Sequence, residues 1–165
     1  MTKFLLCFVL LIAKLPAIIY LEPTPQFKPR FEVATVYIEY NGQILLLHRQ
    51  NDKSQGNKWG IPGGKVEKNE TPLQAAIREV KEETGMDISG QDIETIKAVY
   101  VEYDEKINFV YHAFRTQLQG NPVVVKINFD EHKGFTWVAP ADALKMDLLQ
   151  DEDACLQKDY FNLEN

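Results

Sequence analysis

Short runs of apolar residues, separated by polar turns and loops, predict strands along much of the chain. Phe31 to Tyr40 is rich in β-branched and aromatic residues, and Gln43 to His48 is a second apolar run. Asn41-Gly42 between them is typical of a two-residue hairpin turn, because both residues tolerate a positive φ. Similar runs predict further strands at Ile96 to Tyr103, Ile107 to Gln117, Val123 to Asn128 and Phe135 to Val138. Pro62-Gly63-Gly64 predicts an irregular break in the short stretch Trp59 to Val66.

A helix is predicted to begin after Thr71 and to end at Gly85. Thr71 is a natural N-cap, Pro72 suits the first helical position and Gln74 completes a capping box. One apolar face follows from the spacing i, i+3, i+4 and i+7 of Leu73, Ala76, Ile77 and Val80. Two more helical segments are predicted at Asp142 to Gln150 and Glu152 to Phe161. Strands mixed with few helices indicate an α/β or α+β sandwich.

The first thirty residues have a different character. Phe4 to Ala13 is an apolar run that is too short to span a bilayer, and no small-x-small cleavage pair follows it directly. Leu15 to Leu21 predicts a short strand, and Glu22 to Arg30 is a proline-rich connector. Three interpretations stay open for residues 1–30: an apolar arm packed on the domain or on a second copy of the chain, an exported or membrane-anchored segment, and a start codon placed too far upstream.

Length, charge and cysteine content limit the function classes. A chain of 165 residues suits one domain. Its formal net charge of −6 disfavours a broad groove for nucleic acid, whose phosphates an acidic surface repels. Cys7 and Cys155 provide neither a disulfide framework nor a zinc site. A small anionic substrate would need local positive charge, and a divalent metal held by carboxylates supplies it.

Three carboxylates gather on the polar face of the predicted helix. Glu79, Glu82 and Glu83 are spaced by three and four residues, which places them on one side. Like charges this close favour a hard cation such as Mg²⁺ or Mn²⁺, and Arg78 is placed to pair with Glu82 at i+4. The alternative is an ordinary solvent-exposed acidic face of the helix, with one ion pair and no metal ion.

The residues just before the helix add to this picture. Gly63-Gly64 permits close approach of the backbone to a ligand, and Lys65 offers a mobile cation for phosphate.

One window of 23 residues combines these features at fixed spacing. It reads GKVEKNETPLQAAIREVKEETGM, from Gly64 to Met86. This window resembles the Nudix box, Gly-x5-Glu-x7-Arg-Glu-aliphatic-x-Glu-Glu-x-Gly-aliphatic, at every defined position. The resemblance implies a Nudix hydrolase domain over residues 31–165, with the fold of an α/β/α sandwich around a mixed β-sheet. The box then forms a loop–helix–loop catalytic motif.

The resemblance also implies roles for individual residues. Nudix enzymes hydrolyse a pyrophosphate bond in a nucleoside diphosphate linked to a group X. By matching position, Glu79, Glu82 and Glu83 are expected metal ligands for Mg²⁺, with Mn²⁺ as a substitute, and the Gly63 carbonyl is an expected addition. Arg78 is expected to orient a glutamate, and Glu70 to support the loop.

A further acidic residue is expected to reach the metals from a loop. Glu131 lies ahead of the last predicted strand, where MutT-like members carry such a residue. It is a candidate metal ligand or general base, against the alternative of plain surface charge. One of the box glutamates could serve as the base instead.

Substrate contacts are expected from two other parts of the chain. Arg49 ends the second hairpin strand where MutT-like enzymes have a phosphate-binding arginine; the alternative is an arginine in solvent. Gln150, Asp151 and Glu152 fall where those enzymes read a purine edge, although the asparagine typical of that point has no clean match here. His48 is expected to be structural.

Two classes of function remain. The first is a metal-dependent pyrophosphohydrolase, acting on an ordinary or oxidised nucleoside triphosphate in MutT fashion, or else on a nucleotide sugar, ADP-ribose or a dinucleotide. The second is a sensor that binds a nucleotide without cleaving it, which an intact set of glutamates disfavours. We expect a cytoplasmic protein with a small-molecule nucleotide partner, without long nucleic acid or membrane association, and with an apolar arm suited to a homodimer contact.

Overall fold

The computed structural model describes residues 17–96, 98–104, 107–120 and 124–161, so the apolar run Phe4 to Ala13 lies outside the described residues. The strands in this part of the chain are β1 (Ile18–Tyr20), β2 (Phe31–Tyr40), β3 (Gln43–Arg49), β4 (Trp59–Gly60), β5 (Gly63–Lys65), β6 (Ile93–Thr95), β7 (Val99–Asp104), β8 (Ile107–Gln117) and β9 (His132–Val138). The helices are α1 (Pro72–Thr84), α2 (Pro140–Ala143) and α3 (Glu152–Cys155), which continues as the π-helical turn η1 (Leu156–Tyr160).

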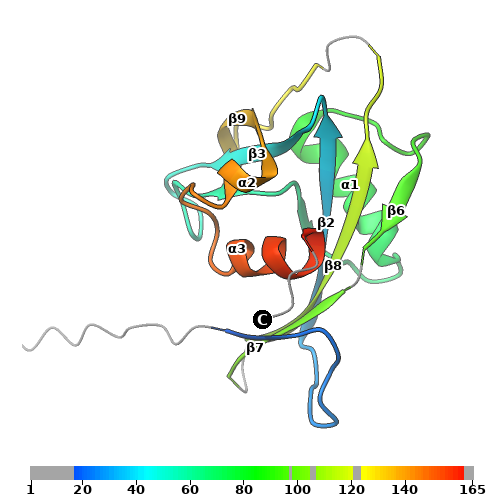
Figure 1. Ribbon diagram of the computed structural model, residues 1–165, viewed down its shortest axis with the longest axis vertical. Coiled ribbons are helices and arrows are strands. Elements are labelled where there is room, and N and C mark those ends of the chain that lie inside the picture. The colour runs from blue at the N-terminus through cyan, green and yellow to red at the C-terminus, as the bar shows by residue number, and fades with distance from the viewer. Residues whose placement is uncertain (1–16, 97, 105–106, 121–123, 162–165) are drawn as a thin grey trace, which may run out of the picture.

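All these strands belong to one mixed sheet, shown in Figure 1. Its main path runs β1-β7-β8-β2-β3-β4, while β5 pairs with β2, β6 with β8 and β9 with β3. The long strands β2 and β8 are parallel, and every other pairing is antiparallel. Strand β5 contacts helix α1, and His132 at the start of β9 contacts Glu83 of the same helix.

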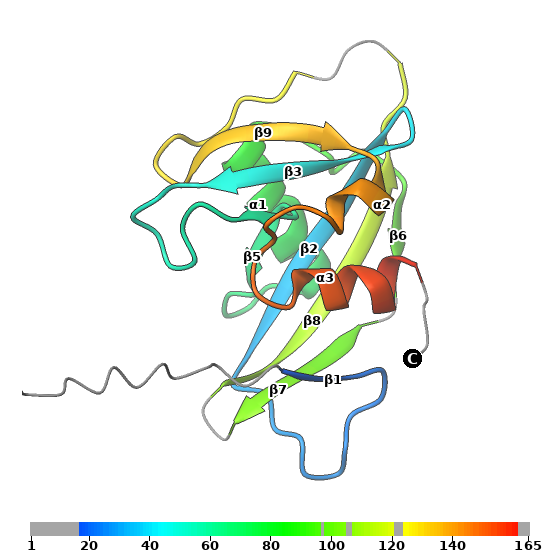
Figure 2. The ribbon, with the colours of Figure 1, turned by 60° about the vertical axis from the view of Figure 1, so that its left-hand side comes forward.

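Both faces of the central strands are apolar because both are covered. Along β3, Leu45 and Leu47 belong to the core cluster that contains α1, whereas Ile44 and Leu46 belong to the cluster that contains α3. The alternation follows from the two-residue period of a strand. Figure 2 shows α1 on one side of the sheet and α2 and α3 on the other, which is the predicted α/β/α sandwich.

The predicted hairpin and helix are confirmed. Asn41 and Gly42 have φ of 51° and 75° between β2 and β3, as a two-residue hairpin turn requires. Helix α1 begins with the capping box of Thr71 and Gln74 and ends at Gly85 in the left-handed conformation, with φ of 68°. The helix that carries the box glutamates is therefore fixed at both ends by its own sequence.

The predicted strand at Val123 to Asn128 is wrong: 124–128 form no strand, and 123 is outside the described residues. The backbone amides of Lys126 and Asn128 donate instead to the carbonyls of Thr84 and Glu83 at the end of α1, at 2.8 and 2.9 Å. The last carbonyls of a helix have no hydrogen-bond partner within the helix. Here they accept hydrogen bonds from backbone amides that would otherwise pair with a neighbouring strand.

Two other expectations need correction. The helix predicted over Asp142 to Gln150 is much shorter, because α2 ends at Ala143. The later residues Asp147 and Leu149 form backbone hydrogen bonds with Trp59 instead. The expected break at Pro62-Gly63-Gly64 is also incomplete, since Gly63–Lys65 forms β5 against β2. Short strands such as β5 and β6 depend on a partner strand far along the chain, which local patterns do not reveal.

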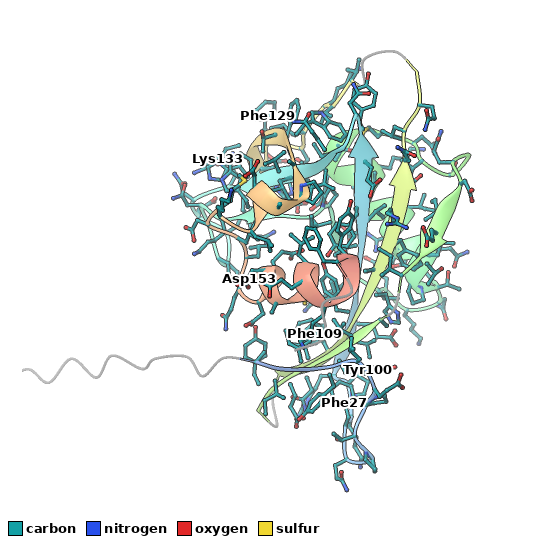
Figure 3. All side chains as sticks on the ribbon, in the orientation of Figure 1. Phe27, Tyr100, Phe109, Phe129, Lys133 and Asp153 are labelled. Carbon is teal, nitrogen blue, oxygen red and sulfur yellow. The ribbon has the colours of Figure 1, made fainter. Side chains whose placement is uncertain are left out.

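The described part of the N-terminal arm joins the sheet. Strand β1 pairs with β7, and Ala17, Ile19 and Leu21 pack against the core cluster on the α3 side. The Phe27 and Tyr100 rings meet edge to face, with centroids 5.4 Å apart, and lie together at the lower edge in Figure 3. In the described part of the chain, no helix has the length and apolar character needed to cross a membrane.

Candidate functional site

Arg78 is the centre of an ion-pair network on α1. Its Nε and Nη2 donate to the two carboxylate oxygens of Glu70 at 3.2 and 2.7 Å, and Nη1 donates to Glu79 Oε1 at 2.8 Å. Nη2 also donates to the Lys65 carbonyl at 3.1 Å. These hydrogen bonds hold the pKa of the Glu70 carboxyl below its usual range and raise the pKa of Arg78. The expected i+4 contact to Glu82 is present but longer, at 3.4 Å.

Glu79 is held between Arg78 and the backbone of Gly64. Burial raises the pKa of the Glu79 carboxyl; Arg78 acts against this, and the carboxylates of Glu83 and Glu82 add to the increase. A Cβ at Gly64 would lie 2.4 Å from Glu79 Oε1, so a larger residue there would displace the Glu79 carboxylate from its present position. The glycine that opens the 23-residue window is thus required by the position of the first glutamate.

Glu83 is the most enclosed of the three helix glutamates, with 5% of its side chain exposed. Its Oε2 accepts a hydrogen bond from the Gly63 N–H at 2.9 Å, and its Oε1 contacts His132 Nε2 at 2.9 Å. Gly63 has a φ of 154°, and a Cβ there would lie 2.3 Å from the Ala34 carbonyl oxygen. Glycine at this position therefore allows β5 to lie close against β2 while its N–H reaches Glu83.

The loop before β9 brings a second acidic residue to the same place. Ligand atoms of Glu83, Glu131 and His132 lie within 4.8 Å of one another. Glu131 also accepts a hydrogen bond of 3.5 Å from the Asn128 side chain. Glu82, by contrast, has 56% of its side chain exposed and lies at the outer rim of the cluster.

This donor set fits a hard divalent cation. Most of its members are carboxylate oxygens, and two of them are largely buried beside other carboxylates, where an unneutralised charge is costly. Of the expected ligands, the structure brings Glu83 and Glu131 together beside His132, while Glu79 lies one helical turn earlier, against Arg78 and Gly64.

The four residues proposed to bind substrate line a single cavity of about 300 Å³. Arg49 and Lys65 contribute its basic groups, and Gln150 and Asp151 lie on the segment that leads into α3. The remaining lining includes Val33, Phe109, Tyr111, Leu149 and Cys155. A cavity with apolar walls and a few polar groups is typical of a small-molecule site.

Hydrogen bonds fix the polar groups of this cavity. Arg49 Nε donates to the Ser54 carbonyl at 2.8 Å, the Tyr103 hydroxyl donates to Asp151, and the Tyr111 hydroxyl donates to Glu152 at 2.9 Å. Burial and the Asp151 carboxylate raise the pKa of Tyr103. Tyr103 therefore supports the cavity wall through its hydrogen bond to Asp151.

The cavity borders the carboxylate cluster along two strands. In β5, Lys65 lines the cavity, while Gly64 and Gly63 contact Glu79 and Glu83. In β3, Arg49 lines the cavity and is the register partner of His132 in β9. Strands β5 and β3 thus connect the basic residues of the cavity with the acidic cluster.

His132 is the site residue that sequence reasoning missed. Its only signal is its place directly after Glu131, and no spacing rule connects it with a helix fifty positions away. His48, in contrast, stacks on the Trp59 ring with centroids 4.2 Å apart, as expected of a structural histidine.

Comparison with known proteins finds one matching family and several relatives. The family model described as the NUDIX domain matches residues 28–158. The chain is 30% identical over 117 residues to the CTP pyrophosphohydrolase of Escherichia coli K12, covering 71% of this chain and 82% of that protein. It is 29% identical over 145 residues to the dihydroneopterin triphosphate diphosphatase of Haemophilus influenzae, covering 79% and 87%.

A solved structure has the same fold. The MutT protein from Methanosarcina mazei Go1 superposes with a TM-score of 0.63 at 26% identity, covering 83% of this chain and 98% of that one.

Proposed function

This chain belongs to the Nudix hydrolase family, and on that premise we propose that it is a Mg²⁺-dependent pyrophosphohydrolase of nucleoside triphosphates, ordinary or oxidised. Water would attack phosphorus and break one phosphoanhydride bond, releasing a nucleoside monophosphate and pyrophosphate. Two curated relatives are named for triphosphate substrates, CTP and dihydroneopterin triphosphate.

One observation carries the proposal: the cavity with Arg49 and Lys65 adjoins the carboxylate cluster through β5. Basic side chains suit the phosphates, and the apolar wall with Tyr111 suits a base. The acidic cluster suits the cations that accompany polyphosphates. A net negative protein would thereby bind a small anionic substrate without having a basic surface.

The chain's own residues would then have distinct tasks. Arg78 fixes Glu79 and ties the loop around Glu70 to α1. Arg49 and Lys65 hold phosphate oxygens, and Gln150 and Asp151 contact the base. Glu131 lies beside Glu83 and is the candidate to accept a proton from the attacking water. A divalent cation, when bound, supplies charge neutralisation at the phosphoryl oxygens and a lower pKa for bound water.

A product assay tests the proposed reaction. We expect the purified protein with Mg²⁺ to release pyrophosphate from a nucleoside triphosphate, and EDTA to abolish this release because the carboxylates alone provide no cation to the phosphates. The panel should contain ordinary and oxidised nucleotides, nucleotide sugars, dinucleotides, ADP-ribose and coenzyme A, with product identification. Release from only a sugar or dinucleotide substrate would move the chain to another Nudix activity, and binding without release would make it a sensor.

Arg49→Ala tests the substrate cavity. We expect KM for the triphosphate to rise about 10–150-fold, because a charge-assisted hydrogen bond to phosphate contributes about 1.5–3 kcal/mol. Steady-state kinetics measure this, with Arg115→Ala as control, since Arg115 pairs with Glu94 outside the cavity. An unchanged KM would show that Arg49 is an ordinary strand-end arginine.

A further inference from the structure

His132 is a buried histidine whose neighbours define what it can do. Only 5% of its side chain is exposed, and its Nε2 lies 2.9 Å from Glu83 Oε1. Its other ring nitrogen, Nδ1, is buried and has no hydrogen-bond partner among the described residues. Among the described residues, the ring therefore makes one hydrogen-bond contact, and its partner is a proposed metal ligand.

The orphaned Nδ1 indicates which nitrogen carries the proton. A neutral imidazole has one N–H and one bare nitrogen. A proton on Nδ1 would be a buried donor without a partner and would leave Nε2 with its lone pair against a carboxylate oxygen. A proton on Nε2 instead donates to Glu83 Oε1 and leaves only an acceptor unsatisfied. The geometry thus favours a donor at Nε2, and a donor cannot simultaneously coordinate a cation.

From this arrangement we propose that His132 is a positioning residue, which together with the Gly63 N–H fixes both carboxylate oxygens of Glu83 for a divalent cation. The two donors reach different oxygens, His132 on Oε1 and Gly63 on Oε2. Each oxygen keeps a further lone pair for an ion. The inference rests on the proposed function, because it assumes that Glu83 holds the metal.

The backbone around His132 makes this placement rigid. The His132 N–H donates to the Asn128 carbonyl at 2.9 Å, and the Asn128 N–H donates to the Glu83 carbonyl at 2.9 Å. The loop that carries the imidazole is thus tied to the residue whose side chain the imidazole holds. Segment 124–128, which forms no strand, thus connects the loop before β9 to the end of α1 through these backbone hydrogen bonds.

Mn²⁺ binding, measured by the loss of the free-ion EPR signal, tests the proposal without substrate. We expect His132→Leu to weaken Mn²⁺ binding by about 10–100-fold, the usual effect of removing a hydrogen bond to a metal ligand. His132→Gln should remain near the wild-type affinity, since its amide N–H can replace Nε2–H. His112→Leu is the matched control: its Nε2 also contacts a glutamate, Glu32, at 2.5 Å, but lies outside the cluster.

The outcomes distinguish the proposed metal site from the proposed positioning role of His132. If the wild-type protein binds no Mn²⁺, the proposed metal site fails. Wild-type binding with equal affinity in His132→Leu overturns the positioning role alone. Pulsed EPR of the wild-type Mn²⁺ complex needs no variant: a strong coupling to a directly bound imidazole nitrogen would make His132 a ligand and would also overturn the proposal. Thermal unfolding without metal checks that each variant is folded.

Discussion

Glu83→Gln should lower kcat by at least about 100-fold. Substitution of a residue that only hydrogen-bonds to a metal ligand already lowers metal affinity or activity by about 10–100-fold, and Glu83 is itself a proposed ligand. The substitution removes the negative charge but keeps the shape of the side chain. Glu83 lies where the Gly63 N–H, His132 and Glu131 converge, so the charge that is lost stands at the centre of the cluster. Steady-state kinetics with saturating Mg²⁺ measure the effect.

Folding should survive this change. The glutamine oxygen can still accept from Gly63, and its NH₂ group can face His132 if the imidazole moves its proton to Nδ1. The expected loss of stability is about 1.5–3 kcal/mol, the usual value for a hydrogen bond to a charged group. Glu94→Gln, on a surface pair with Arg115, is the matched control for both measurements. Near-normal turnover of Glu83→Gln would remove Glu83 from the metal site.

Arg78→Ala should reduce kcat by about 10–100-fold through the ligands that it orients. The guanidinium holds Glu70, Glu79 and the Lys65 carbonyl at the same time. Its removal leaves two half-buried carboxylates without their main partner and frees the loop beside β5. The melting temperature should fall as well, because unpaired carboxylates near one another repel.

Arg78→Lys distinguishes geometry from charge. Lysine keeps the positive charge but has a single donor centre, so it cannot bridge three acceptors in different directions. We expect Arg78→Lys to recover less than half of the lost activity, while Arg115→Ala, which breaks a pair on the surface, should leave kcat near the wild-type value. Full activity in Arg78→Lys would mean that only charge is needed at this position.

Local sequence determined the parts of this protein that depend on near neighbours. The Asn41-Gly42 turn, the capping box of Thr71 and the stop at Gly85 need only residues a few positions apart, and each is found as predicted. The box glutamates follow from the helix for the same reason, because a period of 3.6 residues fixes their common side. Family resemblance then supplied the chemistry that such a cluster performs.

Long-range pairing decided the rest. Segment 124–128 has the composition of a strand, yet its amides bind the last carbonyls of α1, and only the tertiary structure brings them there. The same loop delivers His132 to Glu83, across 49 positions of sequence. Sequence alone thus determined which side chains are acidic and where the helix carries them. The folded sheet decided which donors hold those side chains, since hydrogen bonds form between groups that are close in space.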